Sequence, residues 1–105
     1  LESIDGVRVV NERPDAETSW FGVPTVCEDN NLKRSLVAYL EENKIQTRNY
    51  FAGNILLHPG YRDLGNASDY PNANQVLDKV FFLGCSPTIN EKMLTYIEKV
   101  IGNFQ

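Results

Sequence analysis

The chain has 105 residues, 42% of them hydrophobic and 23% charged, which fits one globular domain with a core of modest size. Its net charge is −4 and its lysines and arginines form no basic run, which argues against a nucleic-acid surface, because neutralising phosphates dominates that affinity. There is no apolar stretch of about 18 residues that could span a membrane and no visible signal peptide, so we expect a cytoplasmic protein with neither nucleic acid nor membrane among its partners.

The first part of the chain predicts two strands and a helix. Residues 6–10 (GVRVV) are short and β-branched, which is typical of a strand. Residues 18–27 (TSWFGVPTVC) predict a second strand, and Pro24 within it favours an edge or bulged position, because proline cannot donate to the ladder. The Asp-Asn-Asn run at 29–31 offers N-caps for a helix that carries apolar residues at helical spacing and should end near Asn43.

The middle of the chain predicts an extended piece followed by a long loop. Residues 45–48 suit an extended conformation, whereas residues 49–70 are rich in Gly, Asn and Pro and look irregular, with one short helical turn at 61–64. Structureless stretches longer than about 12–15 residues are uncommon in compact domains and are usually functional or disordered. This stretch carries too many apolar residues to be disordered, so we expect it to be functional.

The last part predicts helix, strand and helix. Pro71 suits the first turn of a helix, and residues 80–84 (VFFLG) form a short apolar strand. Thr88 or Asn90 should cap the final helix, and Thr88 has capping-box spacing to Glu91. The expected apolar stripe of that helix is Met93, Leu94, Ile97, Val100 and Ile101.

This mixed order of short strands and helices predicts the fold class. We expect an α+β domain in which helices pack on one face of a small, mostly antiparallel sheet. Residues 1–105 should form a single domain, and its start at Leu1 without an initiator methionine suggests a piece of a larger protein. Cys27 and Cys85 belong to no C-x-x-C pair, so we expect two reduced, half-buried strand cysteines rather than a metal site.

The candidate site residues lie in or near the long loop. Arg48 follows a predicted strand and could present its planar fork to a carboxylate or phosphate, or pair with a local acid on the surface. His58 is the only histidine and has no nucleophile or second histidine at a suitable spacing, so we expect it to pack or to make one hydrogen bond. Trp20 suits either the core or a pocket wall. Without a triad, metal cluster or phosphate loop, the chain predicts a domain that lines a site rather than a self-sufficient enzyme.

Five segments carry a resemblance to a known family. They cover most of residues 19–101: SWFG (19–22), LVAYLEENKIQTRNYFAGN (36–54), HPGY (58–61), YPNANQVLDKVFFLG (70–84) and INEKMLTYIEKVI (89–101). Together they resemble the C-terminal small domain of the DegT-type, pyridoxal-phosphate-dependent nucleotide-sugar aminotransferases and dehydrases. The RNYFAGN block, where aminotransferase members carry a His-Tyr-Pro type loop, points to the branch of CDP-4-keto-6-deoxyglucose 3-dehydrase, which serves lipopolysaccharide biosynthesis.

The resemblance implies a fold, a cofactor and a substrate. The fold is the small domain of fold-type I pyridoxal-phosphate enzymes. Pyridoxal or pyridoxamine phosphate would be held by another domain of a homodimeric parent enzyme, with no cofactor in this part, and the substrate would be a nucleotide-linked keto sugar. The implied substrate-binding residues are Arg48, Phe51, Asn54, Trp20 and His58.

The sequence also departs from the family pattern in two places. Residues 86–90 read Ser-Pro-Thr-Ile-Asn where members usually have Tyr-Pro-Gly-Leu-Thr, and His58 stands where glutamine is frequent. Because of both departures, the identity of the substrate stays open. The alternatives are the small domain of a nucleotide-sugar aminotransferase and a non-enzymatic α+β module whose loop binds a protein partner.

Overall fold

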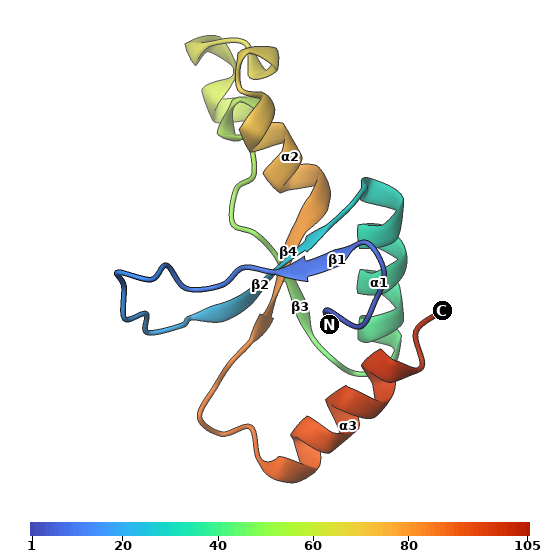
Figure 1. Cartoon of the computed structure of the whole chain (residues 1–105). Coiled ribbons are helices and arrows are strands. Elements are labelled where there is room, and N and C mark those ends of the chain that lie inside the picture. Colours follow the sequence, from blue (N-terminus) through green and yellow to red (C-terminus); the bar gives the residue numbers. More distant parts are fainter.

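A computed structural model describes all residues, 1–105, and contains one four-stranded sheet (Figure 1). The strand order is β1-β2-β4-β3, and every neighbouring pair is antiparallel. This sheet and the helices beside it confirm the predicted α+β class. None of the helices combines the length and apolar character needed to cross a bilayer. The strands are β1 (Val7–Val9), β2 (Gly22–Cys27), β3 (Thr47–Asn49) and β4 (Val80–Gly84).

The position predicted for the second strand is wrong, because β2 lies inside the sheet between β1 and β4. The carbonyl of Pro24 accepts a hydrogen bond from the N–H of Val10, at 3.0 Å. In an antiparallel strand the N and C=O of a residue point to the same side, so the proline nitrogen also faces β1. Proline has no N–H to donate on that side. Because β1 ends at Val9, this costs only one hydrogen bond, at a position beyond the end of β1.

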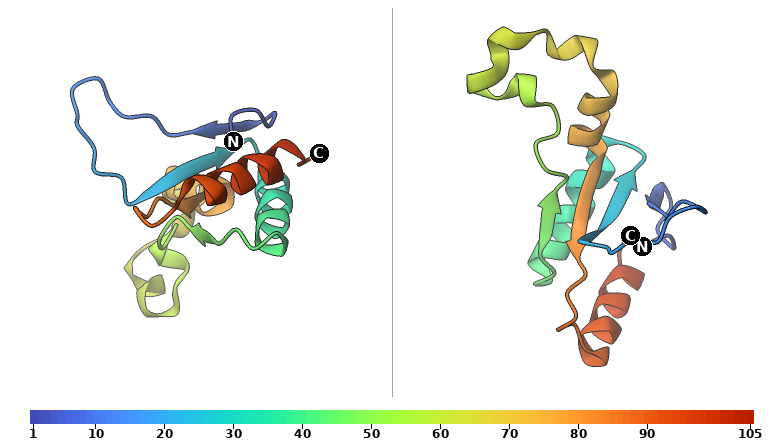
Figure 2. Two further views of the ribbon diagram at one scale, coloured as in Figure 1. Left: turned by 90° about the horizontal axis from the view of Figure 1, so that it is seen from below. Right: turned by 90° about the vertical axis from the view of Figure 1, so that its left-hand side faces the viewer.

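Two helices cover one face of the sheet, as the sequence predicts. Helix α1 (Asn30–Glu42) begins at Asp29, whose carboxylate accepts a hydrogen bond from the N–H of Leu32 at 2.8 Å, and it ends at Asn43. Helix α3 (Glu91–Gly102) packs beside α1. Figure 2 (right) looks onto the opposite face, with α1 behind the sheet. The core between sheet and helices consists of Ile4, Val7, Cys27, Leu36, Leu40, Ile45, Phe81, Leu83, Val100 and Ile101.

Of the two predicted caps of α3, Asn90 is the one that forms: it accepts from the N–H of Met93 at 3.0 Å. Glu91 is therefore the first helical residue, and the capping box with Thr88 does not form. The predicted apolar stripe is also only half buried. Met93 and Leu94 are about half exposed, because the first turns of α3 project away from the sheet and only its C-terminal half meets the core (Figure 1).

The two cysteines are free, as expected, but their burial is unequal. Cys27 is the last residue of β2 and is fully buried in the core. Cys85 follows β4 and is partly exposed; its thiol lies 3.0 Å from the backbone oxygen of Trp20.

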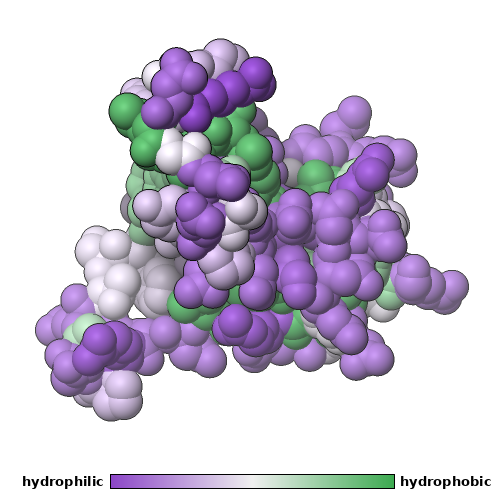
Figure 3. Space-filling model, turned by 90° about the horizontal axis from the view of Figure 1, so that it is seen from above, coloured by the Kyte–Doolittle hydropathy of each residue, from purple (hydrophilic) through white to green (hydrophobic).

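The long loop is more ordered than predicted. Between β3 and α2 (Pro71–Lys79) it forms three short 3-10 turns, at Ile55–Leu57, Pro59–Leu64 and Ala67–Asp69. We call residues 50–70 the arm. The arm and α2 extend beyond the end of the sheet instead of packing on its face (Figure 1), and apolar atoms of the arm reach the surface (Figure 3). The exposed apolar side chains of the arm are Phe51, Ile55, Leu57, Tyr61, Leu64 and Tyr70.

Candidate functional site

The sheet face opposite the helices carries the candidate site, and we call it the open face. Side chains alternate between the two faces along a strand, and directly paired residues share a face. Phe81 points into the helix-covered core, so its neighbour Phe82 points to the open face. Pro24 on β2 and Arg48 on β3 both pair with Phe82 and therefore stand on the open face as well.

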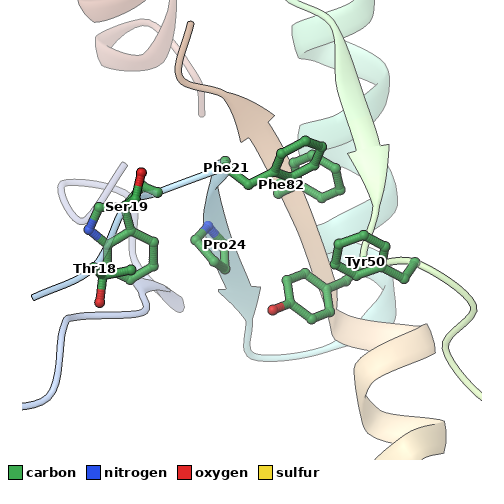
Figure 4. A pocket seen from close by; sticks show the side chains of 9 residues that line it. Thr18, Ser19, Phe21, Pro24, Tyr50 and Phe82 are labelled. Atoms are coloured by element: carbon green, nitrogen blue, oxygen red, sulfur yellow. The ribbon is translucent and has the colours of Figure 1, made fainter. Parts of the chain in front are cut away.

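A pocket of about 260 Å³ lies on this face. Thr18 and Ser19 line one side, Tyr50 and Phe82 line the other, and Pro24 lies between them (Figure 4). Small-molecule sites typically measure about 300–1,000 Å³, so this pocket has room for one ring of a larger ligand. Its full lining is Thr18, Ser19, Trp20, Phe21, Gly22, Pro24, Tyr50, Phe51 and Phe82.

Four aromatic side chains form a cluster at the pocket. The Phe51 ring stacks on Phe82 with centroids 5.9 Å apart and on Phe21 at 6.3 Å, while Tyr50 meets Phe51 edge-on at 5.1 Å. Phe21 and Phe51 nevertheless remain 76% and 70% exposed. Large apolar side chains gathered at a surface are typical of an interaction site, and we call the rings of Phe21, Phe51 and Phe82 the platform.

Two backbone features build the platform. At Gly22, the first residue of β2, an added Cβ would lie 2.5 Å from Cδ2 of Phe82. Only glycine therefore lets the start of β2 approach that ring. Phe51 has a φ of 51°, in the left-handed region that costs a non-glycine residue roughly 1–2 kcal/mol. Such strain in non-glycine residues concentrates at functional sites. Here it turns the chain directly after β3 and holds the Phe51 ring over the sheet.

Arg48 is exposed beside the platform and has no ion-pair partner. The only ion pair in the chain joins Arg13 to Asp15, so the surface pairing considered for Arg48 does not form. Strand β3 is held at Thr47, the residue before Arg48. The Glu41 carboxylate accepts hydrogen bonds from the N–H and the hydroxyl of Thr47 at 2.6 and 2.7 Å. The pKa of Glu41 is lowered mainly by that backbone hydrogen bond, then by the hydroxyl, with a smaller contribution from the charge of Arg48.

Asn54 and His58 lie outside the pocket and hold the arm together. Asn54 is 3% exposed; its amide donates to the Ala67 carbonyl at 3.1 Å and to the Asn74 side chain at 2.8 Å, and its oxygen accepts from Leu56 N–H. His58 makes one hydrogen-bond contact, from Nε2 to the Ala52 carbonyl at 3.1 Å.

The pocket therefore gathers two of the five predicted substrate residues, Trp20 and Phe51. Arg48 is not in the lining but pairs with the lining residue Phe82. The sequence analysis did not select Phe21, Tyr50 or Phe82. Phe21 and Tyr50 are sequence neighbours of selected residues and could have been found that way. Phe82 could not, because only the β3–β4 register brings it next to Phe51.

The lining chemistry suits binding rather than catalysis. Its polar groups are the hydroxyls of Thr18, Ser19 and Tyr50 and the indole N–H of Trp20, and it contains no carboxylate, imidazole, lysine or arginine. No group of three or more His, Cys, Asp or Glu side chains could hold a metal ion. Aromatic faces can stack on planar or sugar rings and hydroxyls can hydrogen-bond to them.

Comparison with known proteins adds a family and several relatives. The sequence profile of the DegT/DnrJ/EryC1/StrS aminotransferase family matches residues 1–102. The chain is 32% identical over 108 residues to dTDP-4-dehydro-2,6-dideoxy-D-glucose 3-dehydratase of Saccharopolyspora spinosa, covering 99% of this chain and 23% of that protein. It is 34% identical over 104 residues to the lipopolysaccharide biosynthesis protein RfbH of Salmonella typhimurium, covering 89% of this chain and 23% of that protein.

A solved structure shares the fold. The aminotransferase TlmJ from Streptoalloteichus hindustanus matches with a TM-score of 0.80 at 17% identity, over 96% of this chain and 26% of that one. At this level of identity the match concerns the fold alone. The chain spans about a quarter of the length of the relatives it matches.

Proposed function

This chain belongs to the DegT/DnrJ/EryC1/StrS aminotransferase family, and we propose that it is the small, substrate-facing domain of a longer nucleotide-sugar 3-dehydrase. That enzyme would use pyridoxal or pyridoxamine phosphate to remove the C3 hydroxyl of a 4-keto-6-deoxy sugar on the route to a lipopolysaccharide. A relative that is named as a 3-dehydratase, and another that is named for lipopolysaccharide biosynthesis, support this assignment.

The observation that carries the proposal is the platform of Phe21, Phe51 and Phe82 with the unpaired Arg48 beside it. Phenyl rings offer an apolar face to the C–H side of a sugar ring, while a guanidinium can bind a phosphate through two parallel hydrogen bonds. Arg48 and Phe82 stand opposite each other on one face, so one ligand could meet both. A sugar linked to a diphosphate has this pairing of a ring and an anion.

The lining of this pocket does not suit the cofactor itself. The pocket lining has no cation and no glycine-rich cradle for the phosphate group of pyridoxal phosphate. The one buried lysine, Lys33, donates its ammonium to the Leu77 carbonyl at 2.7 Å and lies outside the pocket. The cofactor and the proton-transferring residues would therefore come from the remainder of the enzyme, and this chain would contribute binding and orientation.

Transamination is the second candidate function. The family is named for aminotransferases. The two reactions give different products, because dehydration with reduction removes the C3 oxygen, whereas transamination replaces the keto oxygen with an amino group. The platform described here would serve either reaction, so the identity of the product separates them.

The experiment is product analysis with the complete enzyme. It would be incubated with a nucleotide-linked 4-keto-6-deoxy sugar, the cofactor and either an external two-electron reductant or glutamate as amino donor. The proposal predicts a sugar that has lost one oxygen atom in the first mixture and little amino sugar in the second. Amino sugar as the main product would favour the second candidate, and an unchanged substrate in both mixtures would favour the binding module.

A further inference from the structure

The arm joins β3 at one end and α2 at the other, and two side chains of α1 hydrogen-bond to α2. The last carbonyls of α2 accept these bonds. Asn30 donates from Nδ2 to the Asp78 carbonyl at 2.9 Å, and Lys33 donates from Nζ to the Leu77 carbonyl at 2.7 Å. Carbonyls at a helix C-terminus carry partial negative charge and lack partners within the helix. A lysine ammonium is therefore a favourable cap for them.

Lys33 is unusual because it is only 7% exposed, whereas lysine is almost never fully buried unless it is paired. Burial lowers its pKa, and the Cys27 thiol and the Asp78 carboxylate act in the opposite direction. The Leu77 carbonyl is the only hydrogen-bond partner of its ammonium group. The side chain thus connects the buried side of α1 with the last turn of α2.

The position of α2 in turn determines the position of the pocket wall. A Cβ at Gly53 would lie 2.7 Å from Cβ and 3.1 Å from Cα of Leu77, so the backbone at Gly53 rests directly on α2. The next residue, Asn54, donates to the Asn74 side chain of α2 at 2.8 Å. The two residues that make these contacts, Gly53 and Asn54, follow Phe51 within three positions in the sequence. A shift of α2 therefore moves the turn that holds the Phe51 ring in the platform.

We propose that Lys33 is a positioning residue: its bond to the Leu77 carbonyl holds α2, and through Gly53 and Asn54 it holds the pocket wall at Phe51. The lining of the pocket includes neither Lys33 nor its hydrogen-bond partner Leu77. This role concerns the chain itself and does not depend on which sugar or which reaction the complete enzyme has.

The test is the Lys33→Met variant of this chain, which keeps the apolar stem and removes the donor. Amide hydrogen exchange should rise roughly ten- to a hundred-fold across residues 50–79, as expected when a charge-assisted hydrogen bond is lost. Exchange in the buried part of α3 should change far less. Trp20, the only tryptophan, lies in the pocket wall, so its fluorescence should also change.

Three further variants decide between local and general effects. Lys33→Gln, which keeps an N–H donor on a shorter chain, should restore part of the protection, and Lys92→Met on the exposed side of α3 should change nothing. Asn30→Ala, at an exposed position, should loosen residues 50–79 in the same direction even if Lys33→Met fails to fold. Equal loosening of α3 and the arm, or an unchanged arm in both Lys33→Met and Asn30→Ala, would overturn the proposal.

Discussion

Arg48 and Phe82 stand directly opposite each other in the antiparallel pairing of β3 with β4. The pairing places a guanidinium without an ion-pair partner and a stacked phenyl ring on the same open face of the sheet. Neither residue is distinctive by itself, since exposed arginines and strand phenylalanines are common. Their juxtaposition creates a surface with one apolar and one cationic part, which is the basis of the proposed contact with a nucleotide-linked sugar.

The backbone strain at Phe51 predicts a difference between two substitutions. Phe51→Ala loses the stacking on Phe82 and keeps the left-handed φ of 51°. Phe51→Gly loses the same ring but relieves the strain, so its free energy of unfolding should exceed that of Phe51→Ala by about 1 kcal/mol. Urea denaturation of both variants measures this difference. Equal stabilities, or a less stable glycine variant, would mean that Phe51 is not strained.

The contact between Gly53 and Leu77 predicts a costly substitution in the arm. Gly53 has a φ of 61°, and an added Cβ would clash with the backbone and side chain of Leu77. Gly53→Ala should therefore lower the free energy of unfolding by about 1–3 kcal/mol. Gly60→Ala is the matched control, because no atom lies within 4 Å of a Cβ at that position. Similar thermal denaturation midpoints for the two variants would contradict the close packing of the arm on α2.

The anchor of β3 should be sensitive to acid. Hydrogen bonds from Thr47 lower the pKa of Glu41 below its ordinary value of 4.5. Because the folded pKa is depressed, the stabilisation is complete above the ordinary pKa and is lost as the pH falls through the folded value. NMR titration should show the Glu41 carboxyl and the Thr47 amide titrating together below pH 4.5. A Glu41 carboxyl that titrates at or above 4.5 would show that the anchor does not form in solution.

This chain alone should not retain pyridoxal phosphate. Its pocket lining offers no cation for the phosphate, and the buried Lys33 amine is engaged by the Leu77 carbonyl. After incubation with the cofactor and dialysis, the protein should show no visible absorbance from bound cofactor, and Lys33→Met should behave identically. Absorbance that survives dialysis and disappears in Lys33→Met would assign that lysine to the cofactor instead of to α2.

Local signals in the sequence predicted most of the secondary structure. Asp29 and Asn43 bound α1 as expected, and Pro71 begins α2. These residues act on their own backbone or on neighbours within one turn, so sequence alone is sufficient to assign them. The same holds for β4, whose predicted range 80–84 is the observed one.

The remaining features depend on contacts between distant segments. Whether Pro24 is tolerated inside the sheet depends on which neighbour its nitrogen faces, and that follows from the register with β1. Phe82 joins the site because β4 pairs with β2 on one side and with β3 on the other. Met93 and Leu94 match a buried helical stripe, yet they are exposed because of the direction in which α3 leaves the sheet. No local pattern encodes these relationships.

The most direct test of the proposed substrate wall is the kcat/KM of Arg48 variants of the complete enzyme with its nucleotide sugar. Arg48 is exposed, so Arg48→Ala should change the free energy of unfolding by no more than about 0.5 kcal/mol. Loss of a charge-assisted contact should lower kcat/KM roughly ten- to a hundred-fold. Arg48→Lys should recover only part, because lysine lacks the planar fork, and Arg34→Ala on the exposed side of α1 serves as the control. An Arg48→Ala enzyme with unchanged kcat/KM, or one that unfolds while its folded fraction keeps normal kinetics, would contradict the account.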